Sequence, residues 1–395
     1  MSDLDAGMML FSPDAANDPL PVYAQLRDQC PVAPSAGFMG DHDTWYLSRY
    51  EDVIWAMRHP EIFSSSAEAV SIGQEHPLIP LQVDPPEHAH FRRMLDPEFS
   101  PKRMAELEPD VRELTIELIE SFAGSHGCDF HADFSTPLPS TVFLRLMGLP
   151  QSDLPEFMQW RDDTVRPPGD TADEQQARRD AAGAAIARYF EQGIDAKQAN
   201  PCDDLLSRIA HGSVNGRPLA RTEQLGMCHL LLLAGLDTVT ATLDCMVGYL
   251  ARNPESRRAL IDRPELVDAA VEELLRTESP VQVVPRVLKQ DVEVRGQAMK
   301  AGDHVVFVIG AADTDPNEFA DAESVSFERG TNRHMAFGGG PHRCLGSHLA
   351  RMELRVALDE FHRRIPDYEI APGAAVSYSP GIRQADHLPL VFPQR

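Results

Sequence analysis

A single cysteine stands where a glycine-rich segment leads into a helix. Residues 337–346 read FGGGPHRCLG, and residues 349–361 after them have helical spacing. Unpaired backbone N–H groups and the helix dipole at such a start favour the thiolate form of Cys344, while the glycines let the backbone approach a flat ligand closely. The pattern predicts that Cys344 is a soft, anionic ligand for a metal.

Two other interpretations of this segment are open. One is an ordinary glycine-rich turn that buries a cysteine. The other is a zinc site made of His342, Cys344 and His348. The zinc interpretation lacks a second pair of ligands at the spacing of structural zinc sites.

A second chemical pattern lies in the middle of an apolar helical run. Residues 234–238 read AGLDT. Gly235 removes bulk where a flat ligand must approach, and the Thr238 hydroxyl can reach back to the Ala234 carbonyl and open a groove. Asp237 and Thr238 make an acid and alcohol pair suited to delivering protons. The alternative is a core helix that is kinked by its glycine.

Two further pairs of side chains have helical spacing. Glu273 and Arg276 are three residues apart, which in isolation is typical of a surface ion pair worth a few tenths of a kcal/mol. His88 and Arg92 are four residues apart in a helix that begins after two prolines, so two hydrogen-bond donors point the same way. Such donors suit a carboxylate.

Taken together, these patterns resemble the cytochrome P-450 superfamily of haem-thiolate monooxygenases. The family signature F-x-x-G-x-x-x-C-x-G is met by Phe337, Gly340, Cys344 and Gly346, and other family marks follow in order from about residue 84 to the carboxyl end. The chain is most similar to the soluble bacterial class that includes camphor hydroxylase. The resemblance implies a mainly α fold with a minor β part, in which haem b lies between the long central helix and the cysteine-loop helix.

The resemblance also assigns roles to individual residues. Cys344 becomes the proximal ligand of the haem iron, where its electron donation favours O–O cleavage. Asp237 and Thr238 become the catalytic pair. The residues expected to bind the haem are His88, Arg92, Ala234, Gly235, Arg286, Phe337, His342, Cys344 and Gly346, of which His88, Arg92, Arg286 and His342 would hold the propionates. Glu273 and Arg276, with Arg329, are expected to be structural.

An apolar pocket is expected around the substrate. Leu230 and Leu233 precede the AGLDT segment at helical spacing and should face the distal side of the haem. Family wall positions correspond to Val281, Val283, Val284 and Ile382. Arg383, beside Ile382, is the one cation that could reach a substrate carboxylate, although we expect it to face solvent.

The implied activity is the insertion of one oxygen atom from O2 into a C–H bond of a small apolar substrate, such as a terpenoid, a steroid or a fatty-acid-like molecule. No nicotinamide or flavin fingerprint is present, so electrons would come from a two-iron two-sulfur or similar ferredoxin with an NAD(P)H-dependent reductase. One alternative is a peroxide-dependent or isomerising haem-thiolate enzyme, against which the Asp237 and Thr238 pair argues. Another is a haem sensor without turnover.

Composition excludes other classes of protein. The 395 residues carry 36 Lys and Arg against 61 Asp and Glu, and this net charge of −25 argues against nucleic-acid binding. Six cysteines without a tight framework are expected to be thiols. The amino terminus has no secretory signal and no stretch of about 20 apolar residues is found, so we expect a cytoplasmic protein without a membrane anchor.

The basic residues are unevenly distributed along this acidic chain. Several follow the cysteine loop or lie in the segment after His88: Arg343, Arg351, Arg355, Arg363, Arg364, Arg93, Lys102 and Arg103. They predict a basic patch that attracts an acidic ferredoxin.

Periodicity predicts the elements that must position these residues. Helices are expected at residues 21–29, 52–58, 105–122, 141–147, 154–163, 177–198 and 223–252, and strands at residues 45–50, 281–287, 292–294 and 304–308. Residues 166–176 are expected to form a polar, turn-rich connection that could act as a lid. We expect one domain over residues 1–395, acting as a monomer.

Overall fold

Two compact units make up the fold. The computed structural model describes residues 5–35, 43–69 and 74–393. The first unit comprises Met1–Ser64, Pro101–Leu138 and Thr238–Arg395, and the second comprises Ser65–Ser100 and Pro139–Asp237. Each unit is assembled from separated stretches of sequence, and the single domain expected over the whole chain stays a prediction.

The first unit contains a five-stranded sheet that is buried on both faces. Its strand order is β1 (Val32–Ser35), β2 (Thr44–Leu47), β10 (His304–Val308), β7 (Val283–Leu288) and β3 (Phe63–Ser64), and only β2 and β10 are parallel. Alternate residues of β10 belong to two different clusters of core side chains: Val305 and Phe307 to one, Val306 and Val308 to the other. A strand covered on both sides is apolar throughout, as the sequence HVVFV of β10 nearly is.

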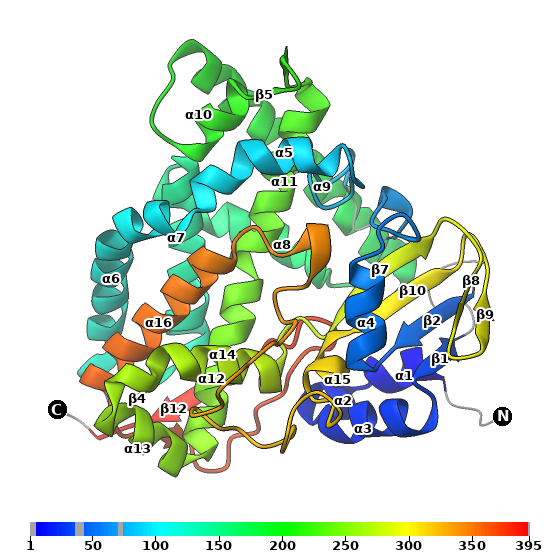
Figure 1. The fold of residues 1–395 in the computed structure, drawn as a ribbon. Coiled ribbons are helices and arrows are strands. Elements are labelled where there is room, and N and C mark those ends of the chain that lie inside the picture. Colours follow the sequence, from blue (N-terminus) through cyan, green and yellow to red (C-terminus); the bar gives the residue numbers. More distant parts are fainter. Residues whose placement is uncertain (1–4, 36–42, 70–73, 394–395) are drawn as a thin grey trace. The chain divides into compact units, whose positions relative to one another are not determined.

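Helices are the predominant regular elements of the first unit (Figure 1). They are α1 (Ala6–Leu10), α2 (Pro13–Asn17), α3 (Leu20–Gln29), α4 (Tyr50–Met57), α6 (Pro101–Ala123), α12 (Thr238–Arg252), α13 (Pro254–Asp262), α14 (Val267–Glu278), α15 (Ile309–Asp313) and α16 (Ser347–Arg364). Helices α6 and α16 pack side by side, where Arg112 bonds Asp359 at 2.9 Å. The remaining short elements are β4 (Gly127–Asp129), η3 (His131–Ser135), η5 (Pro264–Leu266), β8 (Val292–Val294), β9 (Gln297–Met299), η6 (Gly340–His342), β11 (Glu369–Ile370) and β12 (Pro389–Val391).

The second unit is almost entirely helical. Its helices are α5 (His88–Leu95), α7 (Pro137–Met147, whose first two residues belong to the first unit), α8 (Leu154–Val165), α9 (Ala172–Ala199), α10 (Leu205–Ala210) and α11 (Arg221–Leu236). Short elements complete it: η1 (Ala67–Ala69), η2 (Asp96–Phe99), η4 (Gln151–Asp153), β5 (Ser213–Val214) and β6 (Arg217–Pro218). Helix α9 packs against α8, α10 and α11.

The expected elements are confirmed apart from shifts at their ends and two larger corrections. The strand expected over residues 45–50, for example, ends at Leu47, and Tyr50 already begins α4. The predicted connection at residues 166–176 is too long, because α9 already begins at Ala172. A reciprocal cap starts the helix there: the Thr171 hydroxyl accepts the Glu174 N–H, and the Glu174 carboxylate accepts the Thr171 N–H, each at 3.2 Å. Of the connection expected at residues 166–176, only residues 166–171 lie outside a helix.

The second correction concerns the long central helix. The run expected over residues 223–252 is interrupted at Asp237, where φ is −112° and ψ is −38°, so that α11 ends at Leu236 and α12 begins at Thr238. Gly235 lowers the stability of the last turn of α11. Together, the two helices over residues 221–252 are long and apolar enough to cross a membrane. However, 78% of their most apolar 18-residue stretch is buried inside the protein, as in the core helix of a soluble protein.

A buried carboxylate joins the carboxyl-terminal part of the first unit. Glu273 on α14 binds Arg276 at 2.8 and 2.9 Å and Arg329 at 3.0 Å. The backbone N–H of Ser326 and the side chain of Asn332 donate to the same carboxylate. Burial opposes ionisation of Glu273, but these bonds prevail and its pKa lies below the ordinary value. This cluster therefore ties the segment before the cysteine loop to α14.

Removing the Glu273 carboxylate should destabilise the fold. In Glu273→Ala the fully buried guanidinium of Arg276 keeps its carbonyl partners but loses the one carboxylate that pairs with it among the described residues, which costs about 3–5 kcal/mol. Thermal unfolding followed by circular dichroism measures the loss. The matched control is Arg263→Ala, which breaks the exposed pair with Glu328 and should cost less than about 1 kcal/mol. Equal effects of the two substitutions would contradict the structural role of Glu273.

Candidate active site

The cysteine loop has a backbone that only glycine adopts easily. Gly338 and Gly340 lie in the left-handed region, with φ of 68° and 63°. A Cβ at Gly340 would lie 2.2 Å from the Met57 carbonyl oxygen, so the loop also depends on glycine for its contact with α4. The Cys344 N–H donates to the Phe337 carbonyl at 2.8 Å and closes the loop. Cys344 is exposed and precedes the first residue of α16 by three positions.

A second cluster fastens this loop to the helices beside it. The Glu272 carboxylate accepts two hydrogen bonds from Arg351 at 2.6 and 2.8 Å, and it lies 3.0 Å from His334 Nε2. The Arg351 guanidinium covers the Phe337 ring at 4.3 Å. Burial opposes ionisation of Glu272, but Arg351 and His334 lower its pKa to about 2. Glu272 therefore stays charged and holds Arg351 over the loop.

The other cysteines differ from Cys344. None of the six forms a disulfide, and burial raises the pKa of Cys128 and Cys245 to about 12, so these two stay protonated thiols. Cys202 is exposed, as Cys344 is, but it lies in the second unit. Within residues 5–35, 43–69 and 74–393, no three His, Cys, Asp or Glu side chains gather as metal ligands. The zinc interpretation with His342 and His348 is therefore wrong.

One side of the last two turns of α11 is accessible although the residues just before them are buried. Leu230 and Leu233 are partly exposed and Ala234 is exposed, whereas residues 224–229 are all buried. These accessible positions recur at the i, i+3 and i+4 spacing of one helix face. In the second unit, α11 therefore presents an apolar surface where the sequence predicts a pocket wall.

Gly235 makes a close helix contact that the sequence did not predict. A Cβ at this position would lie 2.9 Å from the Phe143 ring of α7, so the missing side chain makes room for Phe143. Ala234, next to it, is the accessible residue. The close approach that the glycine permits is therefore between α11 and α7.

Asp237 has a partner that the sequence analysis missed. Its side chain is 1% exposed, and its Oδ1 lies 3.1 Å from Arg166 of the segment after α8. Its Oδ2 is buried without a hydrogen-bond partner in the described part of the chain. Arg166 is 71 residues away, and no local pattern could have linked the two. One carboxylate oxygen is thus fixed by Arg166, and the other has no partner among the described residues.

The expected propionate ligands occupy defined positions on their elements. His88 and Arg92 lie on α5 in the second unit, and burial, followed by the charge of Arg92, lowers the pKa of His88 to about 4. Arg92 is 2.7 Å from Asp96. In the first unit, Arg286 is buried on β7 with its guanidinium 5.5 Å from the Phe307 ring centroid. His342 is the last residue of η6.

The pocket-wall residues of the first unit are partly brought together. Val281 and Ile382 pair through an isolated β-bridge, and Val283 lies at the start of β7. All three side chains are partly exposed. They form an apolar edge between the start of β7 and the carboxyl-terminal turn.

Arg383 does not face solvent as expected. It is 5% exposed and pairs with Glu278, and its guanidinium donates to the Ala16 and Asn17 carbonyls at 2.8 and 3.2 Å. The Tyr378 ring lies 4.4 Å from it. With its donors occupied in this way, Arg383 joins the amino-terminal helices to α14, and a role in binding a substrate carboxylate is not supported.

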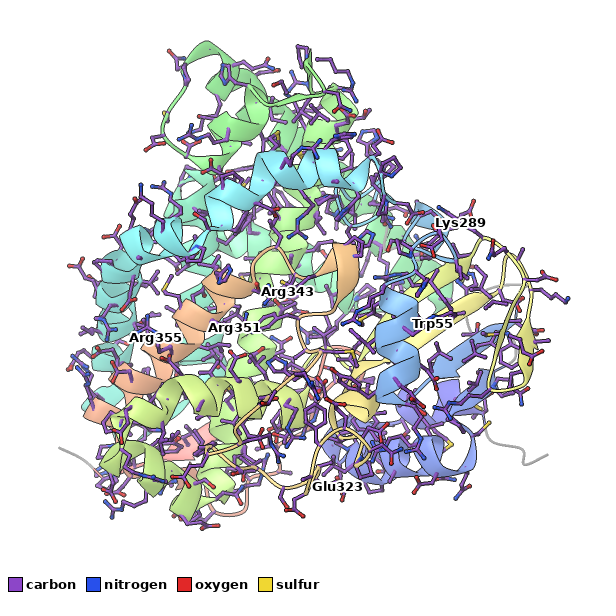
Figure 2. All side chains as sticks on the ribbon, viewed as in Figure 1. Trp55, Lys289, Glu323, Arg343, Arg351 and Arg355 are labelled. Atoms are coloured by element: carbon purple, nitrogen blue, oxygen red, sulfur yellow. The ribbon has the colours of Figure 1, made fainter. Side chains whose placement is uncertain are left out.

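The basic residues around α16 are neutralised more fully than the sequence suggests. Arg343, Arg351 and Arg355 follow one another along the loop and helix (Figure 2). Arg351 pairs with Glu272 and Arg355 with Glu108. Further along α16, the paired arginines are Arg363 (with Asp359) and Arg364 (with Glu120 and Glu360), and on α6 Arg103 pairs with Glu106. The predicted basic patch is therefore interleaved with carboxylates.

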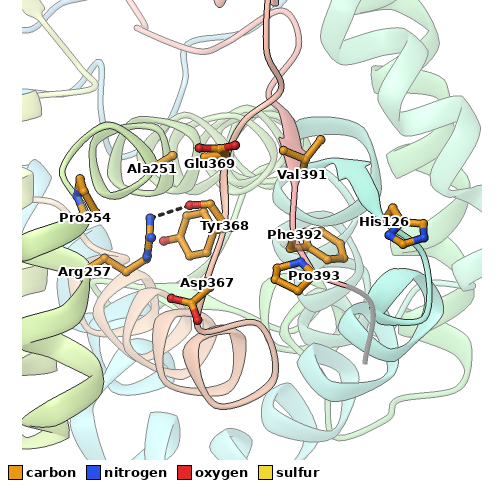
Figure 3. A pocket seen from close by; sticks show the side chains of 10 residues that line it. All are labelled: His126, Ala251, Pro254, Arg257, Asp367, Tyr368, Glu369, Val391, Phe392 and Pro393. Atoms are coloured by element: carbon orange, nitrogen blue, oxygen red, sulfur yellow. Dashed lines mark hydrogen bonds between the residues drawn. The ribbon is translucent and has the colours of Figure 1, made fainter.

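A surface pocket of about 580 Å³ lies elsewhere in the first unit (Figure 3). Arg257 and Tyr368 line it, and the guanidinium donates to the Tyr368 carbonyl at 2.6 Å and covers the same ring at 4.5 Å. None of the predicted site residues lines this pocket. It is not the candidate active site.

Comparisons with known proteins identify the family. The cytochrome P450 family model matches residues 175–364. The chain is 34% identical to the probable cytochrome P450 127A1 of Sinorhizobium fredii over 92% of this chain and 87% of that protein. The chain belongs to the cytochrome P450 family. The mycinamicin IV hydroxylase/epoxidase of Micromonospora griseorubida is 34% identical to this cytochrome P450 over 94% of each chain.

Solved structures support the same assignment. A cytochrome P450 of Bacillus megaterium in complex with testosterone has a TM-score of 0.89 and 29% identity, and the match covers 96% of this chain and 99% of that one. The chain therefore has the cytochrome P450 fold, and it is a monooxygenase whose cofactor is haem b.

The residues in the structure fit this cofactor. A haem iron needs one axial ligand from the protein, because the macrocycle supplies the equatorial nitrogens. Cys344 is an exposed cysteine before a helix, with no second metal-ligating cluster in the described segments, and this donor set suits an iron porphyrin. The apolar, accessible side of α11 suits a flat ring in the same way.

Substitution of Gly340 should disturb the cysteine loop. Gly340→Ala places a Cβ against the Met57 carbonyl in an unfavourable backbone conformation, and we expect about 1–3 kcal/mol of destabilisation. The haem content of purified protein, measured as haem absorbance relative to protein absorbance, should fall several-fold. Gly330→Ala, where the Cβ would meet nothing within 4 Å, should keep full haem content. Normal haem content in Gly340→Ala would contradict this account of the loop.

Proposed function

We propose that this cytochrome P450 inserts one oxygen atom from O2 into a C–H bond of a small apolar substrate, such as a terpenoid, a steroid or a fatty-acid-like molecule. The observation that carries the proposal is the accessible apolar side of α11, formed by Leu230, Leu233 and Ala234, directly before Asp237. An apolar wall next to a group that can deliver protons suits the oxidation of a hydrocarbon skeleton.

Cys344 would hold the haem iron through its thiolate. When bound, the haem would supply the oxygen chemistry, and the electron donation of the thiolate would support it. Phe337 and Gly346 would flank the ligand, and Ala234 and Gly235 would lie against the haem. The haem propionates would accept charge-assisted and neutral hydrogen bonds from four side chains: His88, Arg92, Arg286 and His342.

Asp237 and Thr238 would deliver the protons. Arg166 is 31% exposed and holds Oδ1 of Asp237, whose own side chain is 1% exposed. The pair would therefore link a side chain in contact with water to a buried carboxylate. Its free Oδ2 can take up a proton and pass it to the neighbouring Thr238 hydroxyl. In this scheme Arg166 is a positioning residue that keeps the acid in place.

Named relatives accept substrates of the proposed kind. The methyl-branched lipid omega-hydroxylase of Mycobacterium tuberculosis is 33% identical over 87% of this chain. The Bacillus megaterium structure contains testosterone. On this basis we propose lipid and steroid skeletons as the substrates of the present chain. Val283 and Ile382 would be further residues of the pocket wall.

Electrons would come from a ferredoxin with an NAD(P)H-dependent reductase, and the enzyme would act as a cytoplasmic monomer. Arg343, beside Cys344, is exposed and is the basic residue of the loop itself. Its position favours the approach of an acidic protein. Substrate-dependent NADH consumption should therefore require both added proteins, and consumption by the purified chain alone would contradict the partner proposal.

Loss of the Thr238 hydroxyl should uncouple electron use from product formation. Thr238→Ala should keep haem and substrate binding but divert several-fold more electrons to hydrogen peroxide, because protons then arrive without control. Peroxide and product are measured per NADH in the reconstituted system. The matched control is Thr240→Ala, whose hydroxyl bonds the Ser135 carbonyl at 2.9 Å and should leave coupling unchanged. Full coupling in Thr238→Ala would remove Thr238 from the mechanism.

Ligand binding tests the proposed substrate class. Apolar terpenoids and steroids should shift the ferric haem from low to high spin, and matched carboxylic acids should bind no better, because Arg383 is occupied by Glu278. Titrations followed by the Soret band measure both series. Tight binding of sugar-like compounds with no response to apolar ligands would overturn the proposal.

A further inference from the structure

A histidine on α11 is buried without a partner. His229 is 6% exposed, and in the described part of the chain its Nε2 has no hydrogen-bond partner. Burial, and to a smaller extent the nearby His76, lowers its pKa to about 4. The imidazole is therefore neutral near pH 7, with one nitrogen as a donor and the other as an acceptor.

The unpaired nitrogen of His229 contrasts with a paired polar side chain on the same helix. Gln224, another buried polar residue of α11, donates to the Ile209 and Ala210 carbonyls at 3.3 and 3.0 Å. A buried polar group that is left without a hydrogen bond is costly, and such groups in proteins often mark functional sites. A ligand that offered the missing partner would remove this cost.

The position of His229 places it at the edge of the proposed pocket wall. His229, Leu233 and Asp237 follow one another at i, i+4 and i+8, so they form one row along α11. One turn before His229, a Cβ at Gly226 would lie 2.1 Å from the Pro77 carbonyl oxygen, so the segment around Pro77 packs closely on the helix there. His229 thus lies between the accessible leucines and this segment of the second unit.

We propose that His229 determines substrate specificity by hydrogen-bonding an uncharged oxygen, a hydroxyl or a carbonyl, on an otherwise apolar substrate. This inference rests on the proposed monooxygenase function and defines its substrate class further. The rise of 1.5 Å per residue puts His229 about 12 Å from Asp237 along the helix axis, so an oxygen bound at His229 lies on the order of 10 Å from the proposed proton-delivering acid. A neutral imidazole does not compensate for the desolvation of a carboxylate, so the oxygen carries no charge.

Matched ligands that differ by one oxygen test this role. The probes are three pairs of increasing length: decalin and 2-decalone, dodecane and 2-dodecanone, and 5α-androstane and 5α-androstan-3-one. Spin-shift titrations of the haem-loaded enzyme give the dissociation constant of each compound. In the wild type the ketone of at least one pair should bind about tenfold more tightly than its hydrocarbon, the factor that corresponds to one hydrogen bond of roughly 1.4 kcal/mol.

Three variants separate His229 from general effects on the pocket. In His229→Leu the preference for the ketone should disappear while the hydrocarbon binds at least as tightly as in the wild type, which also shows that the variant is folded. His229→Gln, which keeps a donor and an acceptor, should retain part of the preference. His387→Leu changes a histidine whose side chain is 77% exposed and should behave as the wild type does.

The outcomes distinguish this inference from the function on which it rests. Equal binding of ketone and hydrocarbon in the wild type, or a preference that survives in His229→Leu, would overturn the role of His229 and leave the monooxygenase function intact. The absence of a spin shift with every probe would contradict the apolar-pocket function itself, and the inference would fail with it.

Discussion

A thiolate that binds a haem iron must stay accessible while the backbone that carries it is held rigid. In this chain the two requirements are met by different residues. Glycines at positions 338 and 340 shape the loop and bring it against α4, which leaves Cys344 exposed. Two adjacent acids of α14 then anchor the surroundings: Glu272 binds Arg351, and Glu273 binds Arg276 and Arg329. The position of the cysteine loop thus depends on two carboxylates of α14, Glu272 and Glu273.

The short-range patterns of the chain could be predicted from its sequence. The strand β10 was recognisable from five consecutive residues, and the cysteine loop from ten, because the backbone and the side chains that define them are local. The break at Asp237 was not predicted, because nothing in the apolar periodicity of the run indicates where its hydrogen bonding fails. The connection expected at residues 166–176 was predicted too long for a related reason. The residues after Thr171 are polar, but the cap formed by Thr171 and Glu174 starts a helix there.

Long-range partners are where sequence reasoning failed. Arg166 and Asp237 are 71 residues apart, and Arg383 and Glu278 are 105 apart, so no spacing rule connects them. The sequence placed Arg383 in solvent because arginine is seldom buried, but a partly buried acid and two carbonyls make its burial favourable. The basic patch was overestimated in the same way, since a count of arginines does not reveal the carboxylates of α6 and α14 that face them.

The ligation of the haem by Cys344 is the claim on which the mechanism, the pocket and the role of His229 all depend. The position of the Soret band of the ferrous–CO complex tests it most directly, because the strong red shift requires a thiolate opposite CO. We predict that the wild type and Cys202→Ser, which removes the other exposed cysteine, show the red-shifted band, and that Cys344→Ser lacks it. A red-shifted band that persists in Cys344→Ser would contradict the account.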